Sequence, residues 1–301
     1  MMSVMPTLSV VIPCYRHAEE LARCLNGLAG QDSAAPWEVV VVNSAADPAV
    51  AAAATKGGAR LVQSQARLLP GQARNLGAAH AHGERLAFID ADCVPEAGWL
   101  AAANGALEAG AHLASGPVLH ARPLHPIAVS DNLLQFADFP ANRPDGPARY
   151  FAGCNLAIRR ADFESVGGFP NVIMPAGEDT SFCGAVLARW PNGLHFKRAM
   201  RVRHTGRTTF GAFLDHHATF GYCRAALDLH LAPWQRKWGA HRFMAPPVAA
   251  KRLSYILGRG WQWDRWQLAR TLVLLPIILP GLLAWAAGFQ RGLRTVPGAA
   301  Q

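Results

Sequence analysis

The first 120 residues alternate short apolar runs with helical stretches, and this alternation constrains the fold more than any other feature. The runs LSVVIP (8 to 13), EVVVVN (38 to 43) and ERLAFIDAD (84 to 92) are typical of strands that are covered on both faces. Between them, residues 18 to 31 have the apolar spacing of a helix, and residues 71 to 83 also read as a helix. Strands that alternate with helices predict an α/β fold around a mostly parallel sheet.

The composition indicates a folded protein with an anionic partner. Hydrophobic residues make up 51% of the 301 residues, which is ample for a core. The formal net charge is +9, which suits phosphates, nucleotides or an acidic membrane surface. The six cysteines form no C-x-x-C pair, and this favours a reduced, cytosolic compartment. We interpret the apolar start of the chain as a first strand rather than a signal peptide.

Two carboxylates end the third predicted strand. Asp90 and Asp92 flank Ala91 in FIDAD, at the carboxyl end of the strand, where open α/β sheets bind their ligands. Such a pair can share a hard divalent cation with the phosphates of a nucleotide. The alternative is a turn, in which Asp is common. The sequence reveals no salt-bridge partner for either residue.

A second acidic pair opens a predicted helix. Glu178 and Asp179 precede the apolar residues of GEDTSFCGAVLARW (177 to 190), so the helix is expected to begin at one of them. Acids in a first turn suit the helix dipole, which is one interpretation. A general base that takes a proton from a hydroxyl is the other.

The chain changes character beyond about residue 228. Asp264 is the only acid there, against many Lys and Arg residues. The apolar run 271 to 289 is close to the roughly 20 residues that a spanning helix needs. Pro276 and Pro280 interrupt this run, so a kinked span, a re-entrant hairpin and an interfacial segment all stay open. Trp residues at 261, 263 and 266 precede it, where an aromatic belt would lie.

The ordered set of motifs resembles family 2 glycosyltransferases with the GT-A fold. The resemblance covers roughly residues 7 to 210 and includes GQARNLG, FIDAD, GCNLAIRRADFESVGGF and GED. It implies a three-layer sandwich around a mostly parallel sheet. It also implies a metal-assisted, inverting transfer of a sugar from a UDP- or GDP-sugar to a hydroxyl, with Mn²⁺ or Mg²⁺ as cofactor.

The same resemblance assigns roles to individual residues. It implies that Asp92 binds the metal, that Asp90 contacts the metal or the donor ribose, and that Asp179, beside Glu178, is the general base. His204 lies where relatives complete the metal or diphosphate site, although a structural histidine is the alternative. The expected donor contacts are Pro13, Tyr15, Arg16, Asn43, Asp47, Arg74, Asn75, Asp90, Ala91, Asp92 and Arg207, and the expected acceptor contacts are Gly153, Cys154 and Asn155.

Several of these donor contacts have a simpler structural interpretation. Residues 13 to 16 could form an ordinary turn between strand and helix. Arg74 and Asn75 could lie on a solvated helix face, with Arg74 otherwise a diphosphate contact. Asn43 stands where the family has an acid that reads the nucleobase, and an amide both donates and accepts hydrogen bonds. Asp47 could take part of that role.

We expect residues 1–228 to form the glycosyltransferase domain, with a donor half at about 1–116 and an acceptor half at about 117–228. Residues 229–301 would form a basic, Trp-rich region with a possible membrane segment at 271–289. The acceptor is expected to be lipid-linked, a polysaccharide or a small molecule. The charge bias of the C-terminal region predicts attachment to a membrane surface, at the inner face of the cytoplasmic membrane.

Other functions fit the sequence less well. A catalytically silent, membrane-attached binding protein would be expected to lose the acidic pairs, and both are present. A sugar nucleotidyltransferase usually has a Gly-rich loop after its first strand, where this chain has PCYR. A dehydrogenase is disfavoured because G-x-G-x-x-G follows none of the predicted strands. Nucleic-acid binding is disfavoured because the basic residues surround an apolar region.

Overall fold

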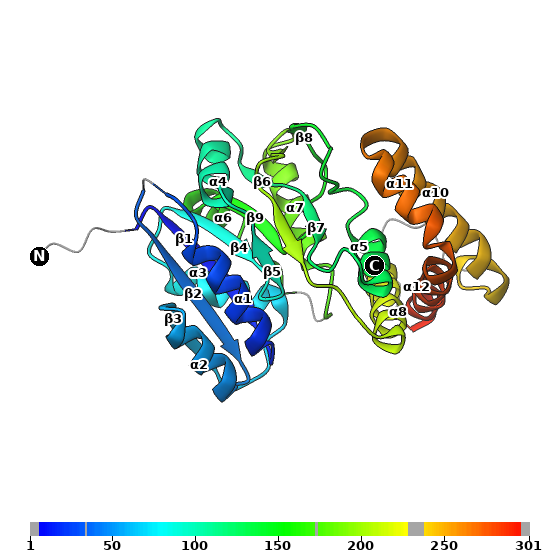
Figure 1. The fold of residues 1–301 in the computed structure, drawn as a ribbon, viewed down its shortest axis with the longest axis horizontal. Coiled ribbons are helices and arrows are strands. Elements are labelled where there is room, and N and C mark those ends of the chain that lie inside the picture. The colour runs from blue at the N-terminus through cyan, green and yellow to red at the C-terminus, as the bar shows by residue number, and fades with distance from the viewer. Residues whose placement is uncertain (1–5, 34, 172–173, 228–237, 296–301) are drawn as a thin grey trace, which may run out of the picture. The chain divides into compact units, whose positions relative to one another are not determined.

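The computed structural model describes residues 6–33, 35–171, 174–227 and 238–295 (Figure 1). These residues form two compact units. The first, here called the sheet unit, consists of Met1–Ala121, Arg143–Ile173 and Glu178–His204. The second, the helical unit, consists of Arg122–Asn142, Met174–Gly177 and Thr205–Gln301. This division differs from the predicted boundary at residue 228, because segments before that residue pack with the C-terminal helices.

An eight-stranded sheet forms the centre of the sheet unit, in the order β3-β2-β1-β4-β9-β6-β10-β8. Strands β1, β2, β3 and β4 are parallel to one another, and β9 runs antiparallel to β4 and β6. The eight strands are β1 (Leu8–Cys14), β2 (Trp37–Ser44), β3 (Arg60–Ser64), β4 (Arg85–Ile89), β6 (Leu113–Ser115), β8 (Gly146–Pro147), β9 (Asn155–Arg159) and β10 (Leu194–Phe196). The predicted α/β fold with a mostly parallel sheet is therefore confirmed.

A second, three-stranded sheet follows the end of β4. Its order is β5-β11-β7, with β5 (Cys93–Pro95), β7 (Val118–His120) and β11 (Val202–His204). The helices of the sheet unit are α1 (Ala18–Ala29), α2 (Pro48–Lys56), α3 (Pro70–His80), α4 (Trp99–Glu108), α6 (Arg160–Ser165) and α7 (Glu178–Arg189). Helix α7 begins at Glu178, as predicted. Helix α3 ends three residues earlier than predicted, because Ala81 adopts extended backbone before β4.

The central strands are buried on both faces, which explains their continuous apolar runs. Val10, Val11 and Ile12 of β1 are all fully buried, although neighbouring residues in a strand point to opposite faces. On one of these faces α3 packs against β1 and β2, where a Cβ at Gly77 would collide with Val11. Glycine therefore allows α3 to approach the sheet closely.

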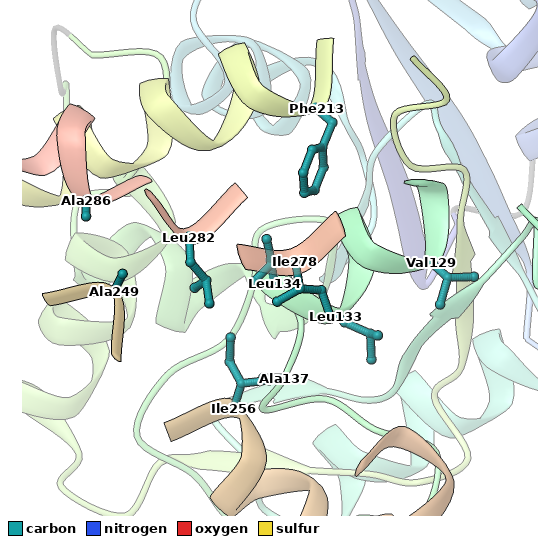
Figure 2. Close-up of a cluster of buried hydrophobic side chains, with 10 residues drawn as sticks. All are labelled: Val129, Leu133, Leu134, Ala137, Phe213, Ala249, Ile256, Ile278, Leu282 and Ala286. Atoms are coloured by element: carbon teal, nitrogen blue, oxygen red, sulfur yellow. The ribbon is translucent and has the colours of Figure 1, made fainter. Parts of the chain in front are cut away.

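The helical unit consists of α5 (Pro126–Gln135), α8 (Phe210–Leu227), the 3₁₀ helix η1 (Arg242–Met244), α10 (Ala245–Trp263), α11 (Arg265–Val273) and α12 (Leu275–Thr295). Its core brings together apolar side chains from α5, α8, α10 and α12 (Figure 2). The cluster contains Val129, Leu133, Leu134, Ala137, Phe213, Ala249, Ile256, Ile278, Leu282 and Ala286.

The apolar run 271 to 289 is divided between two helices. Helix α11 ends at Val273 and α12 starts at Leu275, and the two axes meet at 86°. No single described helix is long and apolar enough to cross a membrane, and only this bent pair passes such a test when its two helices are taken together.

Candidate active site

A cleft of about 210 Å³ opens at the carboxyl ends of β1, β2 and β4. It lies where parallel sheets bind ligands, as the sequence predicted. The FIDAD carboxylates follow β4 in the turn to β5, which confirms the turn interpretation of this motif. Asp90 and Asp92 also line the cleft, and ligand binding by them stays a prediction. The cleft is lined by Pro13, Cys14, Tyr15, His17, Ser44, Leu68, Pro70, Ala73, Asp90, Ala91 and Asp92.

Arg74 joins the two acidic motifs of the sequence. Helix α3 carries this side chain, which is only 2% exposed. One guanidinium nitrogen, Nη2, lies 2.6 Å from Asp90 Oδ1, and Nη1 lies 2.7 Å from Glu178 Oε1. Asp90 thus has a salt-bridge partner that the sequence did not reveal, and the solvated-face interpretation of Arg74 is wrong. The partners are 16 and 104 residues away in sequence, which is why local pattern could not reveal them.

The surroundings of Arg74 are shaped to admit its guanidinium. A Cβ at Gly153 would lie 2.9 Å from Nη2, so a larger residue there would displace the group. The ring of Phe169 covers it at 5.3 Å from the guanidinium carbon to the ring centroid. Burial raises the pKa of the Glu178 carboxyl, and the attraction of Arg74 opposes that shift. One buried cation thus serves two carboxylates, which would otherwise repel each other and lack a counter-charge.

Asp179 is held by hydrogen bonds at the start of α7. Its Oδ2 accepts from the Tyr150 hydroxyl at 3.0 Å and from the Gly153 backbone N–H at 3.1 Å. Its Oδ1 accepts from the Thr180 N–H at 2.7 Å. Burial raises the pKa of the Tyr150 phenol well above its usual value, so this group remains a neutral donor. Asp179 is therefore a fixed, partly exposed carboxylate, and its neighbour Glu178 is committed to Arg74.

Asp92 faces His204 through strand pairing. In the antiparallel pair β5–β11, His204 is opposite Cys93, which directly follows Asp92. His204 Nε2 lies 3.4 Å from Asp92 Oδ2, and the histidine side chain is 6% exposed. Among the described residues, no group of three or more His, Cys, Asp and Glu is arranged to hold a metal ion. The predicted set of Asp90, Asp92 and His204 is thus reduced to a pair, with Asp90 Oδ1 engaged by Arg74.

This pair fits a metal that shares its coordination shell with a ligand. Mg²⁺ and Mn²⁺ prefer oxygen ligands such as carboxylates, whereas imidazole is a better ligand for softer metals. Mg²⁺ in particular is often bound by one or two carboxylates together with substrate phosphates. Asp92 lines the cleft, so an ion bound there would be open to a nucleotide. The donor set therefore suits a nucleotide-dependent site and not a closed structural one.

Tyr15, which lines the cleft at the end of β1, contacts two arginines. The Tyr15 ring lies 5.1 Å from the guanidinium carbon of Arg16 and 4.5 Å from that of Arg67. Arg16 adopts the left-handed backbone, with φ of 59°, as the chain turns from β1 into α1. Arg67 was not among the predicted donor contacts, since it lies in a loop without a motif. An arginine stacked on a cleft-lining tyrosine suits a nucleotide.

Three predicted donor contacts form hydrogen bonds that hold loops or a helix end in place. Asn43 is fully buried, donates to the Asp47 carbonyl at 2.8 Å and accepts from the Asp47 N–H at 3.0 Å. Asp47 caps α2 through the Ala49 and Val50 N–H groups. Asn75 forms two hydrogen bonds with the backbone of Phe169. The structure therefore gives each side chain a structural task, and donor contact stays a prediction for all three.

The predicted acceptor residues are mostly buried. Gly153 contacts Asp179 and Arg74, whereas Cys154 is 4% exposed and Asn155 is fully buried. Asn155 accepts from Trp99 and donates to the Met200 carbonyl, so its amide positions β9 within the unit. These contacts differ from the role expected of Cys154 and Asn155.

Arg207 belongs to the helical unit. Its backbone N–H donates to Asp131 Oδ2 at 2.9 Å, and its side chain lies 3.3 Å from His216. Its donor role stays a prediction.

The chain matches known glycosyltransferases in sequence. Residues 9–167, just over half of the chain, match the family described as Glycosyl transferase family 2. The sequence is 28% identical over 185 residues to Glycosyltransferase AglE of Haloferax volcanii. That alignment covers 59% of this chain and 60% of the relative, so the chain spans less than two thirds of the length of this curated protein.

Solved structures of low sequence identity share the fold. The mannosyltransferase PcManGT from Pyrobaculum calidifontis, in complex with GDP-Man and Mn²⁺, has a TM-score of 0.56 at 20% identity and covers 91% of this chain and 75% of its own. TarS 1–349 of S. aureus has a TM-score of 0.54 at 17% identity, with 96% and 90% covered. GalNAc-T7, solved with UDP, GalNAc and Mn²⁺, reaches 0.50 at 17% identity, with 67% and 44% covered. The protein thus belongs to glycosyl transferase family 2 and has a GT-A-type fold.

Proposed function

We propose that this protein is a metal-dependent glycosyltransferase that moves a sugar from a UDP- or GDP-sugar to a hydroxyl group. The observation that carries the proposal is the Arg74 bridge, which holds the Asp90 motif and the Glu178 motif together beside one cleft. Family membership supports sugar transfer, and the nucleotides and Mn²⁺ bound in two of the similar structures support the donor class and the cofactor.

In this proposal the residues of the cleft divide the work. Asp92 and His204 would hold the divalent ion, and the cleft beside Tyr15 would receive the nucleoside diphosphate. The bound ion would neutralise the charge that develops on the departing diphosphate. Arg74 adds a second positive charge near the same carboxylates and keeps Asp90 in place.

Asp179 would act as the general base of an inverting, single displacement. Its carboxylate would take the proton of the acceptor hydroxyl as that oxygen bonds to the sugar carbon and the diphosphate leaves. The hydrogen bonds from Tyr150 and Gly153 orient the carboxylate for this step. Together with the Thr180 N–H they occupy three of the roughly four acceptor positions of a carboxylate. The fourth is met by the Thr180 hydroxyl at 3.4 Å, and this long hydrogen bond would give way to the acceptor hydroxyl.

The acceptor is proposed to be lipid-linked, a polysaccharide or a small molecule, at the inner face of the cytoplasmic membrane. The basic, Trp-rich C-terminal region supports the membrane attachment, because anionic lipid attracts Lys and Arg residues. The six cysteines are all free and buried, which suits a reducing compartment.

Calorimetric binding of UDP and GDP, with and without Mn²⁺, tests the donor and metal parts of the proposal. We expect one nucleotide to bind with Mn²⁺ and to lose at least about tenfold in affinity in Asp92→Asn, since one carboxylate ligand is removed. Asp145→Asn is the matched control, because Asp145 is an exposed surface carboxylate. Equal loss in both variants, or binding of neither nucleotide, would favour a catalytically silent GT-A protein.

Release of the nucleoside diphosphate from its sugar conjugates tests the base. Asp179→Asn should bind the nucleotide as the unmodified protein does, yet release it about 10²-fold or more slowly, as expected when a general base is lost. Near-normal release from Asp179→Asn would remove this residue from the mechanism.

A further inference from the structure

Helices α11 and α12 expose several large apolar side chains, although these helices belong to a folded unit. On α12 the exposed residues Pro276, Leu279 and Leu283 are spaced as one helical face, and Leu279 and Leu283 are 44% and 47% exposed. At the end of α11, Leu272 is 49% and Val273 is 77% exposed. Exposed leucines are ordinary when they are scattered, but contiguous apolar patches mark interaction surfaces.

The opposite face of α12 is fully occupied by protein. Helices α8 and α12 form the most extensive packing between any two elements of the described chain. A Cβ at Gly221 would collide with the Trp285 carbonyl oxygen, and one at Gly288 with the Ala218 carbonyl oxygen, so the two backbones touch. Helix α12 therefore has one face for α8 and a different face toward the surroundings.

The partner helix makes insertion of the whole unit into lipid unfavourable. Helix α8 carries Asp215, Arg224 and His217, and His217 forms a buried pair with Asp131 at 3.2 Å. Ionisable groups of this kind are costly at the centre of a bilayer. Of the three arrangements that the sequence left open for residues 271 to 289, the interfacial one agrees with these contacts.

Exposed arginines and tryptophans accompany these apolar side chains on α10, α11 and α12. Trp261 and Trp266 are 64% and 77% exposed, and the Arg265 guanidinium lies 3.4 Å from the Trp261 ring centroid. Arg270 is exposed on α11, and Arg291 is exposed beyond Leu283 on α12. The only acid of α10, α11 and α12 is Asp264, which is 8% exposed and caps α11. The exposed residues of α10, α11 and α12 therefore include cations and aromatic rings but no carboxylate.

We infer that the outer face of α11 and α12 docks onto an anionic lipid bilayer and lies in its interface. The apolar side chains Leu272, Val273, Leu279 and Leu283 would enter the acyl boundary, with Trp261 and Trp266 at the level of the headgroups. The arginines would contact lipid phosphates. A second copy of this chain fits less well, because a self-paired face would bring arginines together without acids to balance them.

This inference rests on the membrane attachment of the proposed function, and adds the face that binds and its orientation. The experiment is flotation of the full chain with vesicles of phosphatidylcholine, either alone or mixed with phosphatidylglycerol. We expect binding to the mixed vesicles that weakens as salt is added, and roughly tenfold or greater loss in the double variant Leu279→Asp, Leu283→Asp. Leu124→Asp is the matched control, since Leu124 is 95% exposed outside these helices.

The outcomes separate the inference from the proposals on which it rests. If the full chain floats with mixed vesicles and the double variant floats equally well, the assigned face is wrong although attachment holds. If the full chain floats with neither vesicle, both the attachment and the face are wrong, whereas nucleotide binding is unaffected. Light scattering without lipid tests whether a second copy of the chain binds this face instead. If the full chain is a dimer and the double variant is a monomer, the face is a dimer interface and the bilayer assignment is wrong. Unchanged thermal unfolding of the variants shows that they are folded.

Discussion

The sheet unit and the helical unit both bury ionisable side chains, but they arrange them differently. In the sheet unit, Arg74 lies between Asp90 and Glu178 at the edge of an open cleft. In the helical unit, Asp131 and His217 are both fully buried, within hydrogen-bond range of each other. The first arrangement borders a cavity that can admit a ligand, and the second lies inside a core. A buried pair of ionisable side chains therefore indicates a functional site only together with its access to solvent.

The two units also achieve close packing by different means. In the sheet unit, one glycine of α3 lets a helix approach valine side chains of the sheet. In the helical unit, glycines on both α8 and α12 let backbone meet backbone. Away from this contact, Ile278 and Leu282 of α12 fill the core of the unit, whereas Leu279 and Leu283 are exposed. One apolar run thus supplies both core residues and exposed residues.

The largest effect is expected from removing the bridging cation. Arg74→Met would leave Asp90 and Glu178 close together without their counter-charge, so the free energy of unfolding should fall by about 3 kcal/mol. This is the lower end of the range for buried pairs, because the Asp90 side chain is 33% exposed. Denaturant unfolding at neutral pH measures the change.

Two controls show whether the bridge is the cause. Arg23→Met removes an exposed arginine that pairs with Glu20, and should cost at most about 1 kcal/mol. Adding Glu178→Gln to Arg74→Met removes one stranded charge and should restore part of the loss. If Arg74→Met lowers the free energy of unfolding no more than Arg23→Met does, the Arg74 bridge stabilises the protein no more than an ordinary surface ion pair.

A smaller effect is expected where α8 and α12 touch. Gly288→Leu would place a side chain against the Ala218 carbonyl, and should lower the free energy of unfolding by about 1–3 kcal/mol. Gly258→Leu is the matched control, because a Cβ at this α10 position meets no atom within 4 Å. There leucine should stabilise by about 0.5–1 kcal/mol through its higher helix propensity. Equal changes in the two variants would show that α12 does not depend on backbone contact.

Most of the sheet unit could be predicted because its signals are local. Strands β1, β2 and β4 differ from the predicted runs by at most three residues at either end, since continuous apolar runs suit strands that are buried on both faces. The two acidic motifs were found for the same reason, as each is a pair of neighbours. Their connection through Arg74 spans 104 residues to Glu178, and nothing local encodes it.

The remaining differences arise where backbone geometry decides what a side chain does. Asn43 was assigned by its position near the end of β2, but the loop beyond this strand contains Ala45 and Ala46 at positive φ, which folds Asp47 back onto the amide. The run 271 to 289 is uniformly apolar, so hydropathy alone could not reveal the 86° bend after Val273. The packing of α12 against α8, α10 and α5 separates its inner face from its outer one.

The smallest effect is expected from removing a helix N-cap, and each unit has an aspartate that caps a helix in the same way. Asp47 Oδ1 accepts from Ala49 N–H at 2.8 Å and Val50 N–H at 3.4 Å, and Asp264 caps α11 in the same way. Alanine at either position should lower the free energy of unfolding by about 1 kcal/mol, because an N-cap is lost. Asp47→Ser retains a capping oxygen and should cost less.

Nucleotide calorimetry on Asp47→Ser then decides whether this residue only caps. Serine keeps the hydrogen bond to α2 but removes the charge, so stability and donor binding are separated in one variant. The structure commits Oδ1 to the helix, and we expect UDP and GDP affinities to match those of the unmodified protein. Weaker binding with unchanged stability would instead assign Asp47 to the donor site. The residue that caps α2 would then also bind the nucleotide.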